Sequence, residues 1–324
     1  MNEPEMTAPD TPPVRQAASA PPSRRGRGVF WGLLGGCLLL FVGFTVLASL
    51  MAVVGNRPQQ WWSIGPRVAV VPLEGEIFES RQTIERLRDY LNDGSVRAVV
   101  VRINSPGGAV VPAQEIFSEI RKLRKESGKP IVASLDSVAA SGGYYVAAAC
   151  DQIVANPGSI TGSIGVIVQW FNLEELLGWA RLEPQTITSG SMKDAGSPFR
   201  ELTSDERAYL QSIVTQLHGQ FVRAVIEGRE GKLTAPEVER LADGRVFTGE
   251  QALELRLVDQ LGTLQDAIEL AAREGGIRGT PRTIYPRERT PGLLDLLANG
   301  EAAKALLGKV RQRVEQTRFL YRWY

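Results

Sequence analysis

Hydrophobic positions from about residue 67 onward follow two alternating patterns. Short apolar runs rich in β-branched residues are typical of strands that a parallel sheet buries on both faces. Four such runs occur, at residues 68–73, 98–103, 131–135 and 164–168. Between them helices are predicted over residues 83–91, 112–125 and 142–149. In the second of these, Ile116, Ile120 and Leu123 recur at helical spacing. Strands that alternate with helices require crossover connections, so this region is predicted to be an α/β domain.

Two later helix starts carry a capping box, in which a threonine and a glutamate three positions on satisfy free amides of the first turn, and a third start has a related pair with aspartate. The pairs are Thr203 with Glu206, Thr234 with Glu237, and Thr263 with Asp266. The first pair is expected to open a long helix that runs toward Gly228.

An uncharged apolar stretch covers residues 29–54. At about 1.5 Å per residue, a helix of this length exceeds the roughly 30 Å hydrocarbon core of a bilayer, so we expect a transmembrane helix. A cleaved signal peptide is the alternative, but its apolar core would be only roughly 7–15 residues long. Arg24, Arg25 and Arg27 precede the stretch. The positive-inside bias therefore places the N-terminus in the cytoplasm and the α/β domain outside it.

These patterns divide the chain into five parts. Residues 1–28 are rich in Pro, Ala, Ser and Arg, which predicts a disordered cytoplasmic tail. Residues 29–54 form the transmembrane helix, 55–66 a linker, and 67–285 the α/β domain. Residues 286–324 are predicted to form a basic, amphipathic helical tail. Contact with a membrane surface is one interpretation of such a tail, and a docking helix with one solvated face is the interpretation we favour.

Composition excludes several classes of function. The 37 Lys and Arg residues nearly cancel the 36 Asp and Glu residues, so no nucleic acid partner is expected. Cys37 and Cys150 offer neither a disulfide framework nor metal-ligand spacing, and we expect no metal and no cofactor. The single histidine, His218, lies in an amphipathic run away from any glycine-rich turn. A Ser-His-Asp triad therefore lacks a convincing middle member.

A serine and a lysine are the candidate catalytic pair. Ser141 lies in an Ala-Ser-Gly-Gly-Tyr-Tyr run at a predicted helix start, and Lys193 follows in Gly-Ser-Met-Lys-Asp. A serine hydroxyl needs a base within hydrogen-bond reach, and lysine serves when burial or nearby dipoles lower its pKa from about 10.4. The developing oxyanion also needs donors, which backbone amides of glycine-rich turns supply. Two such turns follow predicted strands, at residues 104–108 and 141–143.

Four motifs in a fixed order resemble those of signal peptide peptidase A in its short bacterial form. They are Ser-Pro-Gly-Gly at 105–108, Ala-Ser-Gly-Gly-Tyr-Tyr at 140–145, Thr-Gly-Ser-Ile-Gly at 161–165, and Lys-Asp followed by Ser-Pro-Phe-Arg at 197–200. The resemblance covers roughly residues 67–285. It implies a caseinolytic protease/crotonase-like spiral fold for the α/β domain.

The same resemblance assigns roles to individual residues. It implies that Ser141 is the nucleophile, Lys193 the general base, and the amides of Gly108 and Gly142 the oxyanion hole. A second hydroxyl commonly orients such a lysine, and Ser163 is the candidate. Ser159 and Thr161 are rival candidates for this role. The alternative interpretation is that the segment is a turn whose hydroxyls only cap nearby backbone groups.

Members of this family assemble into rings, eight subunits in the short form, with serine and lysine contributed by adjacent protomers. They degrade residual signal peptides at the bacterial inner membrane. The resemblance thus implies peptide substrates, a membrane partner through the N-terminal helix, and an extracytoplasmic catalytic domain.

Three functions are consistent with these sequence features. The first is a membrane-anchored serine endopeptidase that acts on signal peptide remnants. The second is a crotonase-like acyl-CoA enzyme, which an extracytoplasmic location away from coenzyme A argues against. The third is an inactive scaffold that binds membrane proteins or peptides.

Overall fold

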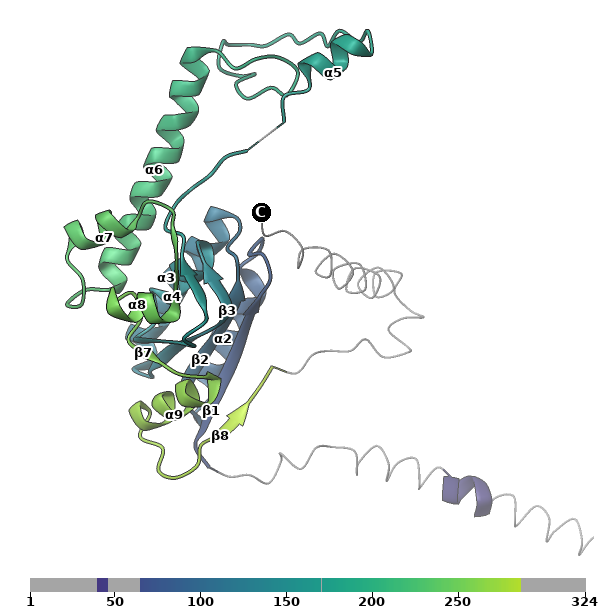
Figure 1. The fold of residues 1–324 in the computed structure, drawn as a ribbon. Helices are drawn as coiled ribbons and strands as arrows, with labels where there is room; N and C mark the ends of the chain where they lie inside the picture. Colours follow the sequence, from purple (N-terminus) through teal and green to yellow (C-terminus); the bar gives the residue numbers. More distant parts are fainter. Residues whose placement is uncertain (1–39, 46–64, 170, 287–324) are drawn as a thin grey trace, which may run out of the picture. The chain divides into compact units, whose positions relative to one another are not determined.

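The computed structural model describes residues 40–45, 65–169 and 171–286 of the 324-residue chain (Figure 1). Residues 40–45 are helical and belong to a different unit from the residues that begin at Gly65. Among the described residues, no helix has the length and apolar character needed to span a bilayer. Nearly all of the tail, transmembrane helix, linker and C-terminal tail predicted over 1–28, 29–54, 55–66 and 286–324 lies outside this description.

Eight strands of the described chain form one sheet, in which every pairing except β5–β6 is parallel. Their spatial order is β6-β5-β3-β2-β1-β8, while β4 pairs with β3 and β7 pairs with β4. The strands are β1 (Arg67–Glu74), β2 (Val96–Ser105), β3 (Ile131–Ala140), β4 (Gln152–Ala155), β5 (Ile160–Gly162), β6 (Val246–Thr248), β7 (Gln260–Leu261) and β8 (Arg282–Ile284).

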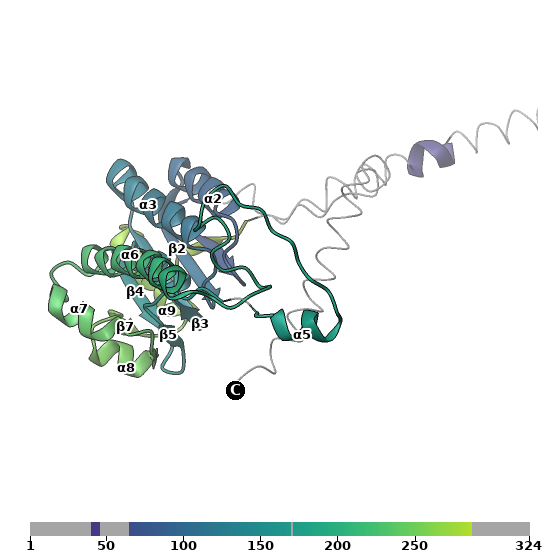
Figure 2. The ribbon, with the colours of Figure 1, turned by 90° about the horizontal axis from the view of Figure 1, so that it is seen from above.

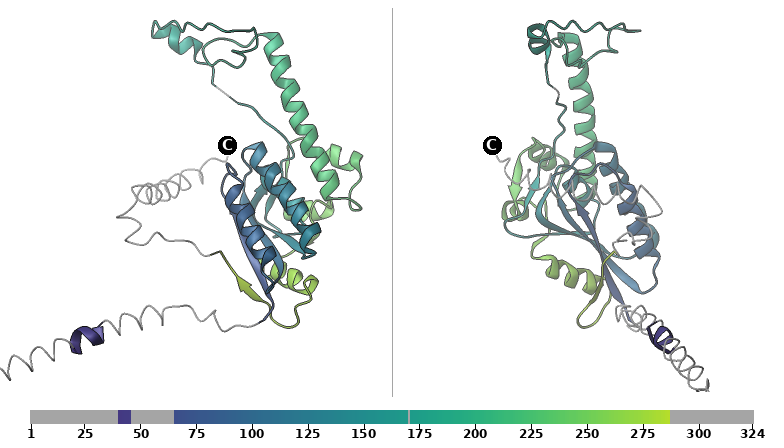
Figure 3. Two further views of the ribbon diagram at one scale, coloured as in Figure 1. Left: turned by 180° about the vertical axis from the view of Figure 1, so that it is seen from behind. Right: turned by 90° about the vertical axis from the view of Figure 1, so that its right-hand side faces the viewer.

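Helices cover both faces of this sheet, as the continuous apolar strands predict. Ala69 and Val71 of β1 belong to the core cluster shared with α2, α3 and α4, whereas Val68 and Val70 pack with α9. Figure 3 (right) shows α2 and α3 in blue on one side and α9 in yellow-green on the other. The helices are α2 (Arg81–Asn92), α3 (Val110–Ser127), α4 (Gly142–Ala147), α5 (Glu174–Trp179), α6 (Ser204–Gly228), α7 (Ala235–Leu241), α8 (Gly249–Glu254) and α9 (Leu264–Glu274).

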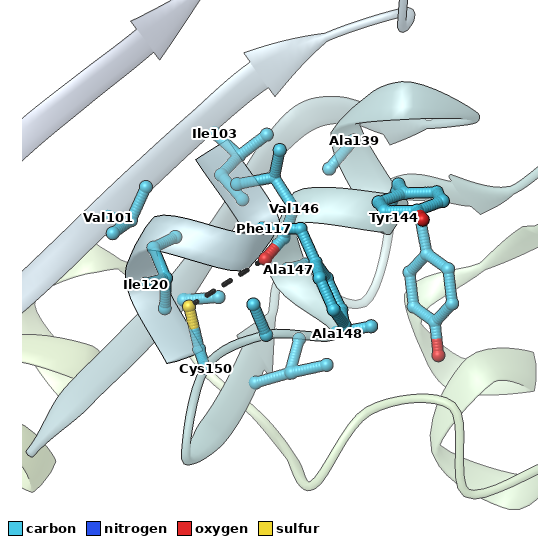
Figure 4. Close-up of a cluster of buried hydrophobic side chains, with 14 of the residues drawn as sticks. Val101, Ile103, Phe117, Ile120, Ala139, Tyr144, Val146, Ala147, Ala148 and Cys150 are labelled. Carbon is cyan, nitrogen blue, oxygen red and sulfur yellow. Dashed lines mark hydrogen bonds between the residues drawn. The ribbon is translucent and has the colours of Figure 1, made fainter. Parts of the chain in front are cut away.

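The short helix α4 lies inside the larger core cluster (Figure 4). Tyr144 is fully buried, and its hydroxyl donates to the carbonyl oxygen of Leu257 at 2.8 Å. Val146 and Ala147 are also fully buried, in the same core cluster as Ile103 of β2. A helix packed this tightly fixes the residue that precedes it, because protein interiors transmit strain and leave little free volume.

Strand β3 changes partner along its length. Its first half pairs with β4, with Val132 opposite Gln152, and its last three residues pair with β5, with Ala140 opposite Gly162. On the other side β3 pairs with β2. The carboxyl end of β3 is therefore supported from both sides where α4 begins.

The α/β class predicted from the sequence is confirmed. Strands predicted at 68–73, 98–103 and 131–135 correspond to β1, β2 and β3, and helices predicted at 83–91, 112–125 and 142–149 correspond to α2, α3 and α4. The three capping boxes are present at the starts of α6, α7 and α9. The long helix predicted from Thr203 toward Gly228 is α6.

The strand predicted at 164–168 is wrong. The segment has no regular secondary structure, and the strand that pairs with β3 is β5, which ends at Gly162. Ser163 has a φ of 50°, which interrupts the extended backbone. Ile164 is buried, but Ile167 and Val168 are 86% and 54% exposed. The apolar run therefore leaves the core after one residue, because the chain turns outward there.

Residues 165–169 and 171–203, which include α5, form a segment that we call the arm. Every described residue from Gly165 to Asp205 is exposed or partly exposed. Figures 1 and 2 show α6 leading from the sheet to the arm. The other end of α6 is packed in the core, where Phe221, Ala224 and Val225 are buried.

Candidate active site

Ser141 occupies the junction between β3 and α4. Its backbone has φ 52° and ψ −120°, outside the regions that non-glycine residues ordinarily adopt. Its amide donates to the carbonyl oxygen of Gly162 at 2.9 Å, and its carbonyl oxygen accepts from the amide of Tyr145 at 2.9 Å. A strained conformation of this kind costs on the order of 1–3 kcal/mol and is concentrated at functional sites. Ser141 is thus presented on a sharp turn between a strand and a helix.

The Ser-Pro-Gly-Gly turn follows β2 and lies against this junction. Gly108 has a φ of 154°, and the backbone of Ile77 brackets it: the Ile77 amide donates to Gly107, and the Ile77 carbonyl oxygen accepts from the Ala109 amide. A Cβ on Gly108 would lie 2.5 Å from the Ile77 backbone. A side chain is therefore excluded at Gly108.

The amides of Gly108 and Gly142 are available to a ligand. Neither donates a hydrogen bond to any residue that the structure describes. Gly142 is the first residue of α4, where helix amides are unpaired, and a Cβ built on it would lie 3.5 Å from the Gly108 nitrogen. Both residues line the same small cavity as Ser141. The structure therefore brings together three of the predicted site residues.

This cavity has a volume of about 30 Å³ and is mainly apolar. Tyr145 of α4 packs against Phe221 of α6, with ring centroids 4.8 Å apart, and burial raises the pKa of the Tyr145 hydroxyl. Leu217 and Val110 complete much of the wall. A larger depression of about 610 Å³, between α2 and α3, shares no lining residue with it. We place the candidate site at the smaller cavity, because only that one contains the serine and the unpaired amides.

Ser163 lies next to Ser141 on the neighbouring strand end. The carbonyl oxygen of Gly162, the residue before Ser163, accepts from the Ser141 amide, and adjacent strands lie about 4.8 Å apart. Ser163 also has positive φ, 50°, and its amide donates to the carbonyl oxygen of Arg245 at 2.8 Å. Two strained serines thus follow two paired strands.

The rival hydroxyls have structural partners. Ser159 is buried, and its hydroxyl donates to the carbonyl oxygen of Asp136 at 2.6 Å. Thr161 is fully buried, and its hydroxyl donates to the carbonyl oxygen of Ala139 at 2.7 Å. The hydroxyl of Ser163 has no hydrogen bond to the described protein, so it remains available.

Lys193 is not in this cavity. It is exposed on the arm, in a turn where its amide donates to the carbonyl oxygen of Gly190 at 3.1 Å. No described polar contact joins it to Ser141, and Lys193 does not line the cavity. Within one chain, the structure therefore leaves the predicted serine and lysine apart.

The remaining reactive groups have other environments. The Nε2 atom of His218 lies 2.8 Å from the carbonyl oxygen of Ala242, within the α6–α7 region. Cys150 is buried, and burial raises the pKa of its thiol. Within residues 40–45, 65–169 and 171–286, no group of His, Cys, Asp and Glu side chains could hold a metal ion.

The sequence did not reveal the apolar wall of the cavity. Phe221 and Leu217 stand 80 and 76 positions from Ser141 and meet it only through packing of α6 on α4. The sequence predicted the long helix that carries them but not the element against which it packs. Arg200 was recognisable only as part of the Ser-Pro-Phe-Arg motif.

Comparisons with known proteins place the chain in a family. Residues 123–278 match the sequence profile of Peptidase family S49. The chain is 42% identical over 212 residues to a "Putative protease" of Synechocystis sp., covering 65% of this chain and 75% of that protein. It is 35% identical over 285 residues to a "Putative protease" of Methanocaldococcus jannaschii, covering 80% and 89%.

A "Putative signal peptide peptidase SppA" of Enterococcus faecium is 36% identical over 215 residues, covering 66% of this chain and 62% of that protein. Among solved structures, a mutant of the 1510-N membrane-bound stomatin-specific protease is similar, with a TM-score of 0.45, 15% identity, and coverage of 69% of this chain and 99% of that one. On the sequence matches, this chain belongs to peptidase family S49, with the proteases of the signal peptide peptidase A type.

Proposed function

We propose that the chain is a serine endopeptidase in which Ser141 is the nucleophile and Lys193 the general base. The observation that carries the proposal is the cavity where Ser141, on a strained turn, meets the unpaired amides of Gly108 and Gly142. A tetrahedral intermediate needs hydrogen-bond donors beside the nucleophile, and two unpaired amides in the same cavity meet that need, since preorganised donors lower the barrier without reorganisation.

The chemistry follows from these groups. The neutral amine of Lys193 takes the proton of the Ser141 hydroxyl as Oγ attacks the carbonyl carbon of the peptide bond. The negative oxygen accepts hydrogen bonds from the amides of Gly108 and Gly142. The lysine ammonium then gives its proton to the leaving amine, and the C–N bond breaks. Water, deprotonated by the same lysine, releases the acyl group and restores the hydroxyl.

Ser163 would orient the lysine in this scheme. Its available hydroxyl and its position beside Ser141 support the role, whereas the hydroxyls of Ser159 and Thr161 already bond backbone carbonyl oxygens. A hydroxyl that accepts a hydrogen bond from the lysine amine fixes its direction toward Ser141.

We propose further that Lys193 serves the Ser141 of a neighbouring subunit in a ring, eight subunits by resemblance. The exposed position of Lys193 supports this arrangement, and so do the apolar side chains that the arm exposes. Phe171, Trp179 and Ile187 are 78%, 83% and 100% exposed. Exposed apolar surface of this extent is typical of interaction sites, and a second copy of the chain is the partner that would complete the catalytic pair.

The substrates we propose are signal peptide remnants, and the location is the outer face of the bacterial inner membrane. Support comes from the name of the Enterococcus faecium relative and from the uncharged stretch at residues 29–54. The caseinolytic protease/crotonase-like spiral is the fold we propose for the domain, supported by the divided pairing of β3.

A subunit-mixing experiment tests the proposal. Ser141→Ala and Lys193→Ala should each abolish peptide cleavage by the full-length protein, while the matched controls Ser137→Ala and Lys125→Ala, both exposed, keep it. When the two inactive variants assemble together at random, about one quarter of the sites regain both groups if adjacent subunits share each site. No recovery would contradict sharing between subunits. Full activity of Ser141→Ala would contradict the assignment of Ser141 as the nucleophile. Absence of cleavage by the unaltered protein would favour the inactive scaffold.

A further inference from the structure

The guanidinium of Arg200 holds the loop that carries Lys193. Its Nε atom donates to Oδ2 of Asp194 at 3.0 Å, and Nη2 donates to the carbonyl oxygen of Asp194 at 3.1 Å. Asp194 directly follows Lys193 in the chain. Arg200 therefore fixes both the backbone and the side chain of the residue next to the lysine.

The same guanidinium binds the first turn of α6. Nη1 and Nη2 donate to the two carboxylate oxygens of Glu206, at 2.9 and 2.5 Å. Glu206 is itself held in the capping box, because its carboxylate accepts from the Thr203 amide at 3.0 Å and its amide donates to the Thr203 hydroxyl at 3.3 Å. A continuous set of hydrogen bonds thus connects the lysine loop to a 25-residue helix.

This network joins the exposed arm to a buried carboxylate of α6. Glu206 is only 3% exposed, although every described residue from Gly165 to Asp205 is exposed or partly exposed. The hydrogen bonds from Arg200, with those from Thr203, lower the pKa of Glu206 to about 2. The carboxylate is therefore ionised throughout the neutral and alkaline range. Bidentate pairs in a network are the ion pairs that hold geometry, unlike isolated surface pairs.

We propose that Arg200 is a positioning residue for the general base: it locks the Lys193 loop onto α6 so that the amine reaches the serine in one fixed place. The inference rests on the proposed function. Lysine has a long, flexible side chain, so its placement depends on how firmly its backbone is held. A misplacement of about 1 Å at a reacting group can cost about 100-fold in rate.

Variants at Arg200 test the role. Arg200→Lys keeps the charge but cannot form the planar fork, and Arg200→Ala removes both. Arg207, the residue after Glu206, is exposed and makes no ion pair with any residue of the described chain, so Arg207→Lys and Arg207→Ala are matched controls. The readout is the rate of acylation by a serine-directed acylating inhibitor, expressed per titratable serine and followed from neutral to alkaline pH.

We expect acylation to slow about 10-fold in Arg200→Lys and about 100-fold in Arg200→Ala. We also expect the rising limb of the pH profile to move to higher pH, because a loosened amine spends more time hydrated and charged. Asp194→Asn, which leaves Glu206 and the helix cap intact, should show a smaller shift in the same direction. The Arg207 variants should match the unaltered protein.

A wild-type rate per titratable serine in Arg200→Ala, with an unmoved pH limb, would overturn the inference. A loss explained wholly by fewer assembled subunits, measured by light scattering, would also overturn it, because Arg200 would then act on structure alone. Lys193→Ala separates the two proposals. If that variant retains activity, the proposed function fails and this inference fails with it. If Lys193→Ala is inactive while Arg200→Ala is normal, only the positioning role is wrong.

Discussion

Replacing Arg229 by methionine should destabilise the protein strongly. Arg229 follows α6 and is 1% exposed, and its Nη1 and Nη2 atoms donate to the two carboxylate oxygens of Asp259 at 2.9 and 2.8 Å. Its Nη2 also donates to the carbonyl oxygen of Arg256 at 2.7 Å. The Asp259 carboxylate in turn accepts from the Ile153 amide of β4 at 2.7 Å. The pair therefore ties α6 to the sheet.

The magnitude follows from what remains after the change. Removing one partner of a buried ion pair typically costs about 3–5 kcal/mol, because the other charge stays buried. Here the Lys232 ammonium, with Nζ 2.5 Å from Oδ1 of Asp259, still compensates part of that charge. We expect Arg229→Met to lower the free energy of unfolding by about 3 kcal/mol at neutral pH, near the lower limit of this range.

The loss should depend on pH. Burial raises the pKa of Asp259, but the hydrogen bonds and charge of Arg229, with a further hydrogen bond from Lys232, outweigh it and lower the pKa overall. A lowered pKa stabilises the folded state above the unfolded value of about 3.9, and this stabilisation is lost as pH falls through the folded value. The difference between Arg229→Met and the unaltered protein should therefore be largest at neutral pH and shrink below about pH 4.

Urea unfolding of the full-length protein, at one fixed protein concentration, measures both the loss of stability and its dependence on pH. Lys122→Ala is the control, since Lys122 and Glu126 are each more than half exposed and lie 3.9 Å apart. Such a pair is worth about 0.3–0.5 kcal/mol. A loss below about 1 kcal/mol for Arg229→Met at pH 7, or a loss of equal size at pH 3, would refute the reasoning.

Three further outcomes are expected. Gly108→Ala should lower kcat/KM by about 10²- to 10³-fold in a peptide assay while circular dichroism stays unchanged, because the added methyl would meet the Ile77 backbone and displace one oxyanion donor; unchanged kinetics would contradict the donor role. Leu217→Ala should widen the cavity of about 30 Å³. Compared with the unaltered protein, this variant should prefer substrates with leucine over alanine before the cleaved bond about 10-fold more strongly, measured by competition. The rate should rise toward alkaline pH if a lysine serves as the general base, and a flat profile would argue against one.

Local signals carried most of what the sequence predicted. Capping boxes at Thr203, Thr234 and Thr263 depend on residues three positions apart, and the structure contains all three. The strand error at 164–168 has the opposite origin. Its apolar side chains match a buried strand, but Ser163 turns the backbone outward and leaves Ile167 exposed, which only the surrounding fold decides.

The candidate site was also predictable only where its signals are local in the sequence. The glycine turn and the serine run were recognisable because each is a continuous motif that follows a strand. Their meeting in one cavity depends on the pairing of β2 with β3, a contact between distant residues. The apolar wall from α6 depends on packing of Phe221 on Tyr145, and no spacing along the chain encodes it.

The length of α6 sets how far the arm lies from the sheet. Its 25 residues span about 37 Å, with a buried ion pair at one end and the Arg200 network at the other. In a ring, this helix would set the distance between Ser141 of one subunit and the Lys193 amine that the same subunit contributes to the next site. Inserting seven residues into its exposed part would lengthen it by about 10 Å and turn it back by only about 20°. Such a chain should fold yet carry its lysine past the neighbouring serine, so that subunit geometry, rather than any side chain, would abolish catalysis.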